Sequence, residues 1–459
     1  MHLPPEAALI GWIPFGLYLF RRYPARIAIL ANFLGGWAVL PGACYIPTNE
    51  AFPYWIVGVC LPTNYLLTKA LVTGLTGLAG VLVFHRADLS RFRPMVVDLP
   101  MAVWCCVPVL SAVAHWSTHH GGLAEAAYQT ISWGVPWLLG RIYFCDRDSL
   151  LKAARACVAA GICYVPICLF ELCAGPQLYA FVYGYQPYRW VGAARYVGFR
   201  PIGFLEDGNQ LGIWMAGATL LAFFLFRDRP AGRILGLPIR WSTVGLAVVT
   251  LLCQSAGSIL LLLILLPLAL FRQRSVHRAF VAVLVSSILA FALLRMTNLV
   301  SLRALVKRDP VAHSLSIALT SVGRHSLAWR FAQDERYIAV ALQRPLFGFG
   351  RWNWWQGGGY RPWSLWLLVF GMYGLVGLVA FGAMLLLPVV RVVRMPQGDS
   401  VSDGSNLQLA LAALILMVAI DNLLNGAMIL PYLLILGGLA AVQTSVGEVE
   451  LAESDPVWA

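Results

Sequence analysis

Apolar stretches recur along the whole chain and are separated by short polar segments. A hydrocarbon core about 30 Å thick needs roughly 20 apolar residues to cross it as a helix, and a spanning backbone must satisfy its own hydrogen bonds. Hydrophobic residues make up 59% of the 459-residue chain and charged residues only 12%, which leaves too little polar surface for a soluble domain. The sequence therefore predicts an all-α, polytopic integral membrane helical bundle, and it excludes a cytosolic enzyme, a secreted disulfide scaffold and a free nucleic-acid-binding protein.

The apolar stretches predict about 12–13 spans, and the segment 50–65 is predicted as a loop or a short extra span. The predicted spans lie near residues 7–20, 27–43, 66–84, 95–113, 126–144, 153–173, 207–226, 241–255, 257–271, 279–296, 363–390, 407–424 and 427–443. They divide the chain into an N-terminal transmembrane bundle (1–173), a transmembrane region opened by a basic loop (174–296), a large outer loop with short amphipathic helices (297–361), C-terminal transmembrane helices (362–446) and a short acidic cytoplasmic tail (447–459).

The distribution of arginine predicts the orientation of the spans. Most basic residues lie in one alternating set of short loops, which the positive-inside rule assigns to the cytoplasm. The two long loops predicted on the outer side, about 174–206 and 297–361, are also basic. The second holds nine Lys and Arg against three Asp and Glu. Guanidinium groups clamp phosphates in a bidentate way, so an anionic substrate at the outer surface explains this charge. Binding to lipid headgroups, or a different topology, remains the alternative.

The first candidate motif runs from Arg195 to Asn209 and opens directly into an apolar run. Its prolines and glycines predict a tight turn back into the membrane, with Asp207 or Asn209 capping the next helix. A helix N-terminus behind Arg195 and Arg200 is a place to hold a diphosphate. Glu206 and Asp207 lie where span and loop meet, where ionisable groups are costly unless used or paired. The alternative is a structural pair between Arg200 and one of these carboxylates.

The second candidate motif contains Gly323, Arg324, His325, Trp329 and Arg330. The spacing of apolar residues from Leu327 to Leu342 predicts an amphipathic helix on the outer face. A cation such as Arg324 is unfavourable near the positive end of a helix dipole, and a ligand explains it better than stability does. His325 is a candidate general base or simply a solvated side chain.

The third candidate motif is Trp352-Asn-Trp-Trp355, followed by three glycines and Arg361. Indole rings pack on the C–H faces of sugars, and Trp355 and Arg361 are candidate substrate-binding residues. Tryptophan is also enriched at membrane interfaces, and the sequence alone does not separate these two interpretations.

At these residues the chain resembles the O-antigen ligase and O-antigen polymerase superfamily of bacterial envelope glycosyltransferases. The matching elements are Arg200 with Gly203 and Asn209, Gly323-Arg324 with Trp329, Pro345-Leu-Phe-Gly348-Phe-Gly350, and the glycine-containing span Gly371-Met-Tyr-Gly374-Leu-Val-Gly377. The resemblance covers roughly residues 195 to 390 and rests on the order of these short motifs around one outer loop.

The resemblance implies metal-independent glycosyl transfer, without a cofactor, at the outer face of the bacterial inner membrane. The donor would be a polyprenyl-diphosphate-linked glycan and the acceptor a glycan or lipid, as in lipopolysaccharide and other polysaccharide biosynthesis, with membrane lipids and an envelope assembly complex as surroundings. Arg200 and Arg324 would hold the diphosphate and stabilise its charge as it leaves. Ligases of this superfamily place a histidine just before the span after the large loop, whereas this chain has Arg361-Pro-Trp-Ser364. Glu206, Asp207 and His325 are therefore the remaining candidates for the base.

Two other functions compete with a glycosyltransferase. A transporter or flippase of a lipid-linked or anionic solute would need charged or broken helices inside the membrane, and Asp421, Asn422 and Asn425 lie in a late span. A non-catalytic scaffold of an envelope assembly complex would predict that the outer-loop arginines are replaceable. Nucleic acid is not needed to explain the net charge of +12.

Overall fold

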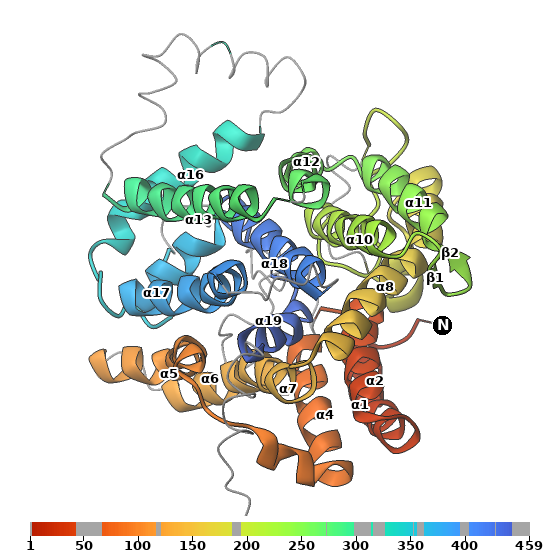
Figure 1. Cartoon of the computed structure of the whole chain (residues 1–459). Helices are drawn as coiled ribbons and strands as arrows, with labels where there is room; N and C mark the ends of the chain where they lie inside the picture. The colour runs from red at the N-terminus through yellow and green to blue at the C-terminus, as the bar shows by residue number, and fades with distance from the viewer. Residues whose placement is uncertain are drawn as a thin grey trace, which may run out of the picture.

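The computed structural model describes residues 2–42, 67–115, 121–185, 194–271, 273–297, 314, 326–351, 353–355, 362–394, 404–426 and 428–442. Within these ranges almost every residue in regular structure is helical, and the strands form a single small hairpin of β1 (Arg233–Ile234) and β2 (Leu237–Pro238). The all-α prediction is confirmed for this part of the chain (Figure 1).

The α-helices follow the order of the predicted apolar segments. They are α1 (Pro5–Arg22), α2 (Ala25–Leu30), α3 (Gly36–Val39), α4 (Lys69–Phe84), α5 (Leu99–Ala114), α6 (Gly122–Gln129), α7 (Val135–Tyr143), α8 (Arg147–Ala174), α9 (Leu178–Tyr183), α10 (Gly208–Asp228), α11 (Ile239–Leu252), α12 (Ala256–Leu270), α13 (Arg274–Met296), α16 (Ser326–Ala341), α17 (Leu365–Arg394), α18 (Gly404–Asp421) and α19 (Tyr432–Ala441). Two π-helical segments, Ala31–Gly35 and Thr130–Gly134, join α2 to α3 and α6 to α7, and 3-10 turns cover Arg86–Arg91 and Val96–Asp98.

Helix length and hydropathy agree with a membrane protein. In the described part of the chain, five helical segments are long and apolar enough to cross a membrane: Val96–Ala114, Arg147–Ala174, Gly208–Asp228, Ser275–Met296 and Leu365–Arg394. Several shorter apolar helices accompany them. Many of their leucines and valines point outward and are exposed, as expected of side chains that face lipid rather than water.

The long helices run between two common ends of the bundle. Near the end of α8, Glu171 contacts residues that precede α10, while Arg155 near the start of α8 contacts Arg233, which follows α10. The helix α18 has the same polarity as α8, because Asn406 near its start donates to Asp228 at the end of α10. We call the end with Asp228 the arginine end. The opposite end, where the segment 199–207 lies, is called the turn end.

The C-terminal helices α18 and α19 form the centre of the bundle, and the other helices surround them (Figure 1). The helix α19 packs closely on α7 through Gly140 and Gly437. A Cβ atom on Gly140 would meet the carbonyl group of Leu434, and one on Gly437 would meet the carbonyl oxygen of Trp137. Small residues at such crossings let helix backbones approach in membranes, where dispersion contacts replace the hydrophobic effect.

Candidate functional site

The segment 199–207 forms a tight turn, and side chains of α8 bind its backbone. The Glu171 carboxylate accepts backbone N–H bonds from Ile202 at 2.8 Å and Gly203 at 2.7 Å. Gly203 has a φ of 61°, and a Cβ atom there would also press on the ring of Tyr164, so the position requires glycine. The hydroxyl of Tyr164 accepts a further N–H bond from Phe204 at 3.3 Å. The predicted tight turn is therefore present, and side chains rather than water satisfy its backbone.

Glu206 lies inside the protein in a pair with Lys69. The Lys69 Nζ is 3.1 Å from Glu206 Oε1, and the two side chains are 1% and 2% exposed. The other carboxylate oxygen accepts a bond of 2.9 Å from the Gln210 amide, and the Lys69 ammonium lies 4.1 Å from the centre of the Trp37 ring. Burial raises the pKa of the Glu206 carboxyl, and the charge of Lys69 opposes that rise. These contacts favour an anchoring role for Glu206 over the role of a base that reaches a substrate.

Arg200 lies across the start of α10. Asp207 caps this helix by accepting N–H bonds from Asn209 at 2.7 Å and Gln210 at 2.6 Å, so Asp207 rather than Asn209 is the cap. The Arg200 guanidinium donates a bond of 2.9 Å to the Asn209 side chain, and its aliphatic part covers Gly208. Its Nε atom is buried and has no hydrogen-bond partner among the described residues. Burial lowers the pKa of Arg200 to about 10, so the group is still a cation at neutral pH.

Arg330 reaches the same place from α16, the helix predicted over 327–342. Its guanidinium donates to the Asn425 side chain and lies 5.4 Å from the centre of the Trp363 ring. Its Nε atom is also buried without a hydrogen-bond partner in the described part of the chain. Burial lowers the pKa of Arg330, and nearby carboxylates, Asp207 first among them, oppose this shift. Arg200 and Arg330 act on each other and on Asp207 electrostatically, so two partly buried arginines converge on the capped start of α10.

The segment after α18 and the start of α17 hold α16 in this position. Asp334 of α16 accepts N–H bonds from Trp363 at 2.7 Å and Ser364 at 3.4 Å, and the backbone of Leu365 donates to the carbonyl of Asn425 at 2.9 Å. Burial raises the pKa of the Asp334 carboxyl, and these bonds act in the opposite direction. Asp334, Trp363 and Asn425 were not among the predicted site residues. The sequence signal for Asn425 is the group of polar residues 421–425 in an apolar span, which indicates transport as an alternative, and Trp363 closely follows Arg361 of the third motif.

Two of the glycine motifs behind the resemblance bind each other directly. Backbone bonds join Phe349 to the Gly371 carbonyl and Gly350 to the Met372 carbonyl, both at 2.9 Å, and Leu375 to the Pro345 carbonyl at 2.7 Å. The helix α17 is interrupted where these bonds form, because Gly374 has a φ of 65° and a ψ of −158°. The turn 345–350 therefore supplies partners for the backbone groups that the broken helix frees.

The same turn is also held by α5. Ser111 donates to the Phe347 carbonyl at 2.7 Å, and His115 contacts both the Gly348 carbonyl and the Arg344 guanidinium. The broken part of α17 is thus clamped between α5 and the segment that follows α16. These contacts tie α5, α17 and the segment after α16 together.

The other predicted site residues have different outcomes. Arg195 is exposed, and its charge acts on Arg200. Trp355 is buried at 9% exposure, and its neighbour Trp354 packs against Gly371 and stacks on Phe349, so neither ring presents an open face for a sugar. Three predicted residues, Arg324, His325 and Arg361, lie outside the described residues, as does the side chain of Trp329.

The geometry at the turn end suits the binding of an anion with several oxygen atoms. Two guanidinium groups whose Nε atoms no described residue binds lie near a helix N-terminus, which itself favours negative charge. In the described part of the chain, no three His, Cys, Asp or Glu side chains are grouped so that they could hold a metal ion. A comparison of the chain with family models, curated proteins and solved structures finds no match.

Proposed function

We propose that the protein transfers a glycan from a polyprenyl-diphosphate carrier to a glycan or lipid acceptor, as a polysaccharide polymerase or ligase. It would do so from the bacterial cytoplasmic membrane, which it would cross about 12 to 13 times, with the turn end facing the periplasm. The observation that carries the proposal is the convergence of Arg200 and Arg330, each with a buried Nε atom that no described residue binds.

The chemistry that this site would perform is displacement at the anomeric carbon. The acceptor hydroxyl oxygen forms a bond to that carbon, the bond to the phosphate oxygen breaks, and the electron pair leaves with the diphosphate. The two guanidinium groups stabilise the charge that grows on the leaving diphosphate, and a base takes the proton of the acceptor hydroxyl. Two lipid-held substrates are already confined to the membrane surface, which lowers the entropic cost of bringing them together.

The test is the replacement of each arginine in cells that carry the gene. Arg200→Ala and Arg330→Ala should abolish the surface polysaccharide while the protein still inserts and elutes as a single species. Arg336→Ala is the matched control, because Arg336 is an exposed arginine on the same helix as Arg330. An active Arg330→Ala protein would contradict the proposal.

Mass spectrometry of the extracted polyprenyl-diphosphate glycans then assigns the reaction. Single repeat units that accumulate in the inactive variants mean a polymerase, because chain growth has stopped after the carrier reached the outer face. Long chains that accumulate on the carrier mean a ligase. Unchanged carrier glycans together with unchanged surface polysaccharide would remove the glycosyltransferase proposal.

A transporter or flippase of a lipid-linked or anionic solute is the second candidate. The interruption of α17 at Gly374 favours it, because transporters build their substrate sites from broken helices. The purified protein in liposomes distinguishes the two functions. A flippase would move a fluorescent polyprenyl-diphosphate sugar between leaflets without an acceptor, whereas a transferase would leave its distribution unchanged.

A further inference from the structure

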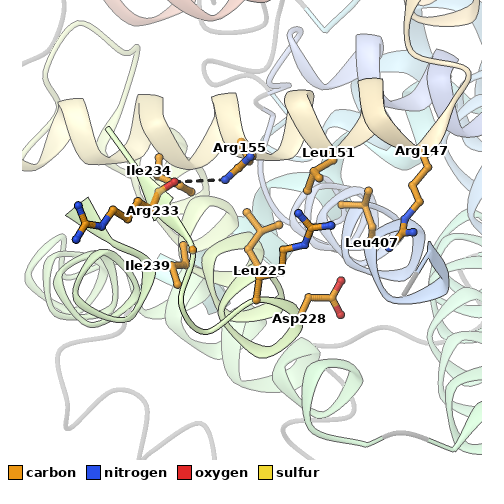
Figure 2. Close-up of a pocket in the computed structure, with 11 residues that line it drawn as sticks. Arg147, Leu151, Arg155, Leu225, Asp228, Arg233, Ile234, Ile239 and Leu407 are labelled. Atoms are coloured by element: carbon orange, nitrogen blue, oxygen red, sulfur yellow. Dashed lines mark hydrogen bonds between the residues drawn. The ribbon is translucent and has the colours of Figure 1, made fainter. Parts of the chain in front are cut away.

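A second basic site lies at the arginine end of the bundle, far from the site at the turn end. It is an open pocket whose lining includes Arg147, Arg155, Arg229 and Arg233 (Figure 2). The helix α10 separates the two sites, with Arg200 packed at its start and Arg229 directly after its end. Its 21 residues span about 31 Å, which is the thickness of a hydrocarbon core. The pocket therefore belongs to the other membrane surface.

The arginines of this pocket come from separate parts of the chain. Arg147 and Arg155 lie on one face of α8 with Leu151 between them, at a spacing of four residues that aligns side chains on a helix. Arg229 follows α10, and Arg233 belongs to β1. The backbone carbonyl oxygen of Arg233 accepts a hydrogen bond of 3.4 Å from the Arg155 guanidinium (Figure 2). All four arginine side chains are exposed. A general excess of charge on this face would not need arginines from separate elements to line one pocket.

Among the described residues that line the pocket, Asp228 is the one carboxylate, and it is already engaged. Asp228 accepts a hydrogen bond of 3.1 Å from the Asn406 side chain of α18. The described lining therefore has four arginines and one carboxylate, and the Arg233 side chain points away from the other labelled arginines (Figure 2). This excess of positive charge attracts an anion.

Apolar residues place the pocket at the level of the lipid headgroups. Leu151 and Leu225 line the same cavity as the arginines. Just beyond it, Trp241 is 62% exposed, and the Arg240 guanidinium lies 5.4 Å from the centre of its ring. Exposed tryptophan with arginine is typical of the membrane interface. Leu235 at the hairpin tip is 61% exposed and adds apolar surface on the same side.

We propose that this pocket binds the phosphate headgroup of an anionic phospholipid from the leaflet at the arginine end. The arginines hold the phosphate oxygens, and the leucines contact the first part of the acyl chains. A soluble phosphate shares the first interaction but not the second, and the experiment separates them.

The experiment uses the full chain, purified in detergent, and measures bound lipid by native mass spectrometry during titration with phosphatidylglycerol or phosphatidylcholine. The pocket variant is Arg155→Gln/Arg229→Gln, and the control is Arg21→Gln/Arg22→Gln, which removes two exposed arginines from the same end of the bundle. A loss of about fivefold per arginine predicts about 25-fold weaker phosphatidylglycerol binding in the pocket variant. The control and the affinity for phosphatidylcholine should stay within about twofold of the original protein.

Equal weakening in both variants would overturn the proposal, because it would show an effect of overall charge alone. Displacement of phosphatidylglycerol by millimolar inorganic phosphate would also overturn it, since the ligand would then be a soluble anion. If the pocket variant does not fold, Arg147→Gln/Arg233→Gln replaces it with the same expected result.

Discussion

Lys69 at the start of α4 and Glu206 in the turn before α10 form an ion pair of 3.1 Å inside the protein. Both side chains are almost completely buried, and Trp37 and Gln210 enclose them. The pair ties the N-terminal helices to the turn that positions Arg200. An N-terminal region that carries no candidate motif therefore supports the candidate site.

Breaking this pair from one side should strongly destabilise the protein. Lys69→Met leaves Glu206 buried without its cation, and such losses cost about 3–5 kcal/mol in the free energy of unfolding. The double variant Lys69→Met/Glu206→Gln should recover much of that loss, because no uncompensated charge remains. Chemical denaturation in detergent measures all three proteins. A single variant as stable as the original protein would show that the pair is not needed for the fold.

Gly348 should tolerate no side chain. Its φ is 64°, and a Cβ atom there would collide with the backbone of Met372 and Tyr373 in the interrupted part of α17. We expect Gly348→Ala to lower the free energy of unfolding by about 2 kcal/mol or more. Gly382→Ala on α17 is the control, since no described atom outside the local helix backbone lies within 4 Å of a Cβ atom at that position. Equal stability of the two variants would mean that the turn does not clamp α17.

Replacing Arg330 by lysine should separate charge from geometry. Lysine keeps the positive charge but loses the planar fork that contacts Asn425 and covers Trp363. Under the proposed function, we expect Arg330→Lys to form product at least about tenfold more slowly than the original protein, with an unchanged melting temperature. Polysaccharide formed per hour in membranes measures the effect. Full activity of the lysine variant would show that only the positive charge of Arg330, and not its planar guanidinium, is needed.

The affinity of the turn end for an anion should fall at high pH. Burial lowers the pKa of Arg200 from its ordinary value to about 10, so its charge is lost as the pH rises through about 10. Calorimetric titration with inorganic pyrophosphate should show weaker binding above this pH. The Arg200→Gln variant should bind weakly at every pH and lack this step. The same step in both proteins would assign it to another group.

The lowered pKa of Arg200 also affects the free energy of unfolding, which rises with pH where the affinity for an anion falls. Between the lowered native pKa of about 10 and the ordinary pKa of arginine, the unfolded chain holds a proton on this group that the native protein lacks. The contribution of Arg200 to the free energy of unfolding therefore rises with pH across that window. Below it, both states are protonated and the contribution is constant.

The sequence determined the helical class and the placement of most helices. Apolar runs bounded by arginine lie where the structure has α8, α10, α13 and α17, because a spanning helix needs a long, uninterrupted apolar segment. The amphipathic spacing after Trp329 predicted α16, and the prolines and glycines around Gly203 predicted the turn. These are local properties, and each can be read from a window of about one helix.

Only the tertiary structure decided which of the candidate residues share a site. Glu206, adjacent in sequence to the cap Asp207, points instead to Lys69, whereas Arg330 joins Arg200 across a long stretch of chain. Asn425 and Trp363 hold Arg330 although no motif distinguished them as ligands of an arginine. Such contacts depend on how whole helices pack, and packing is set by the summed fit of many side chains. Local pattern therefore determines the helices, and their mutual packing determines the site.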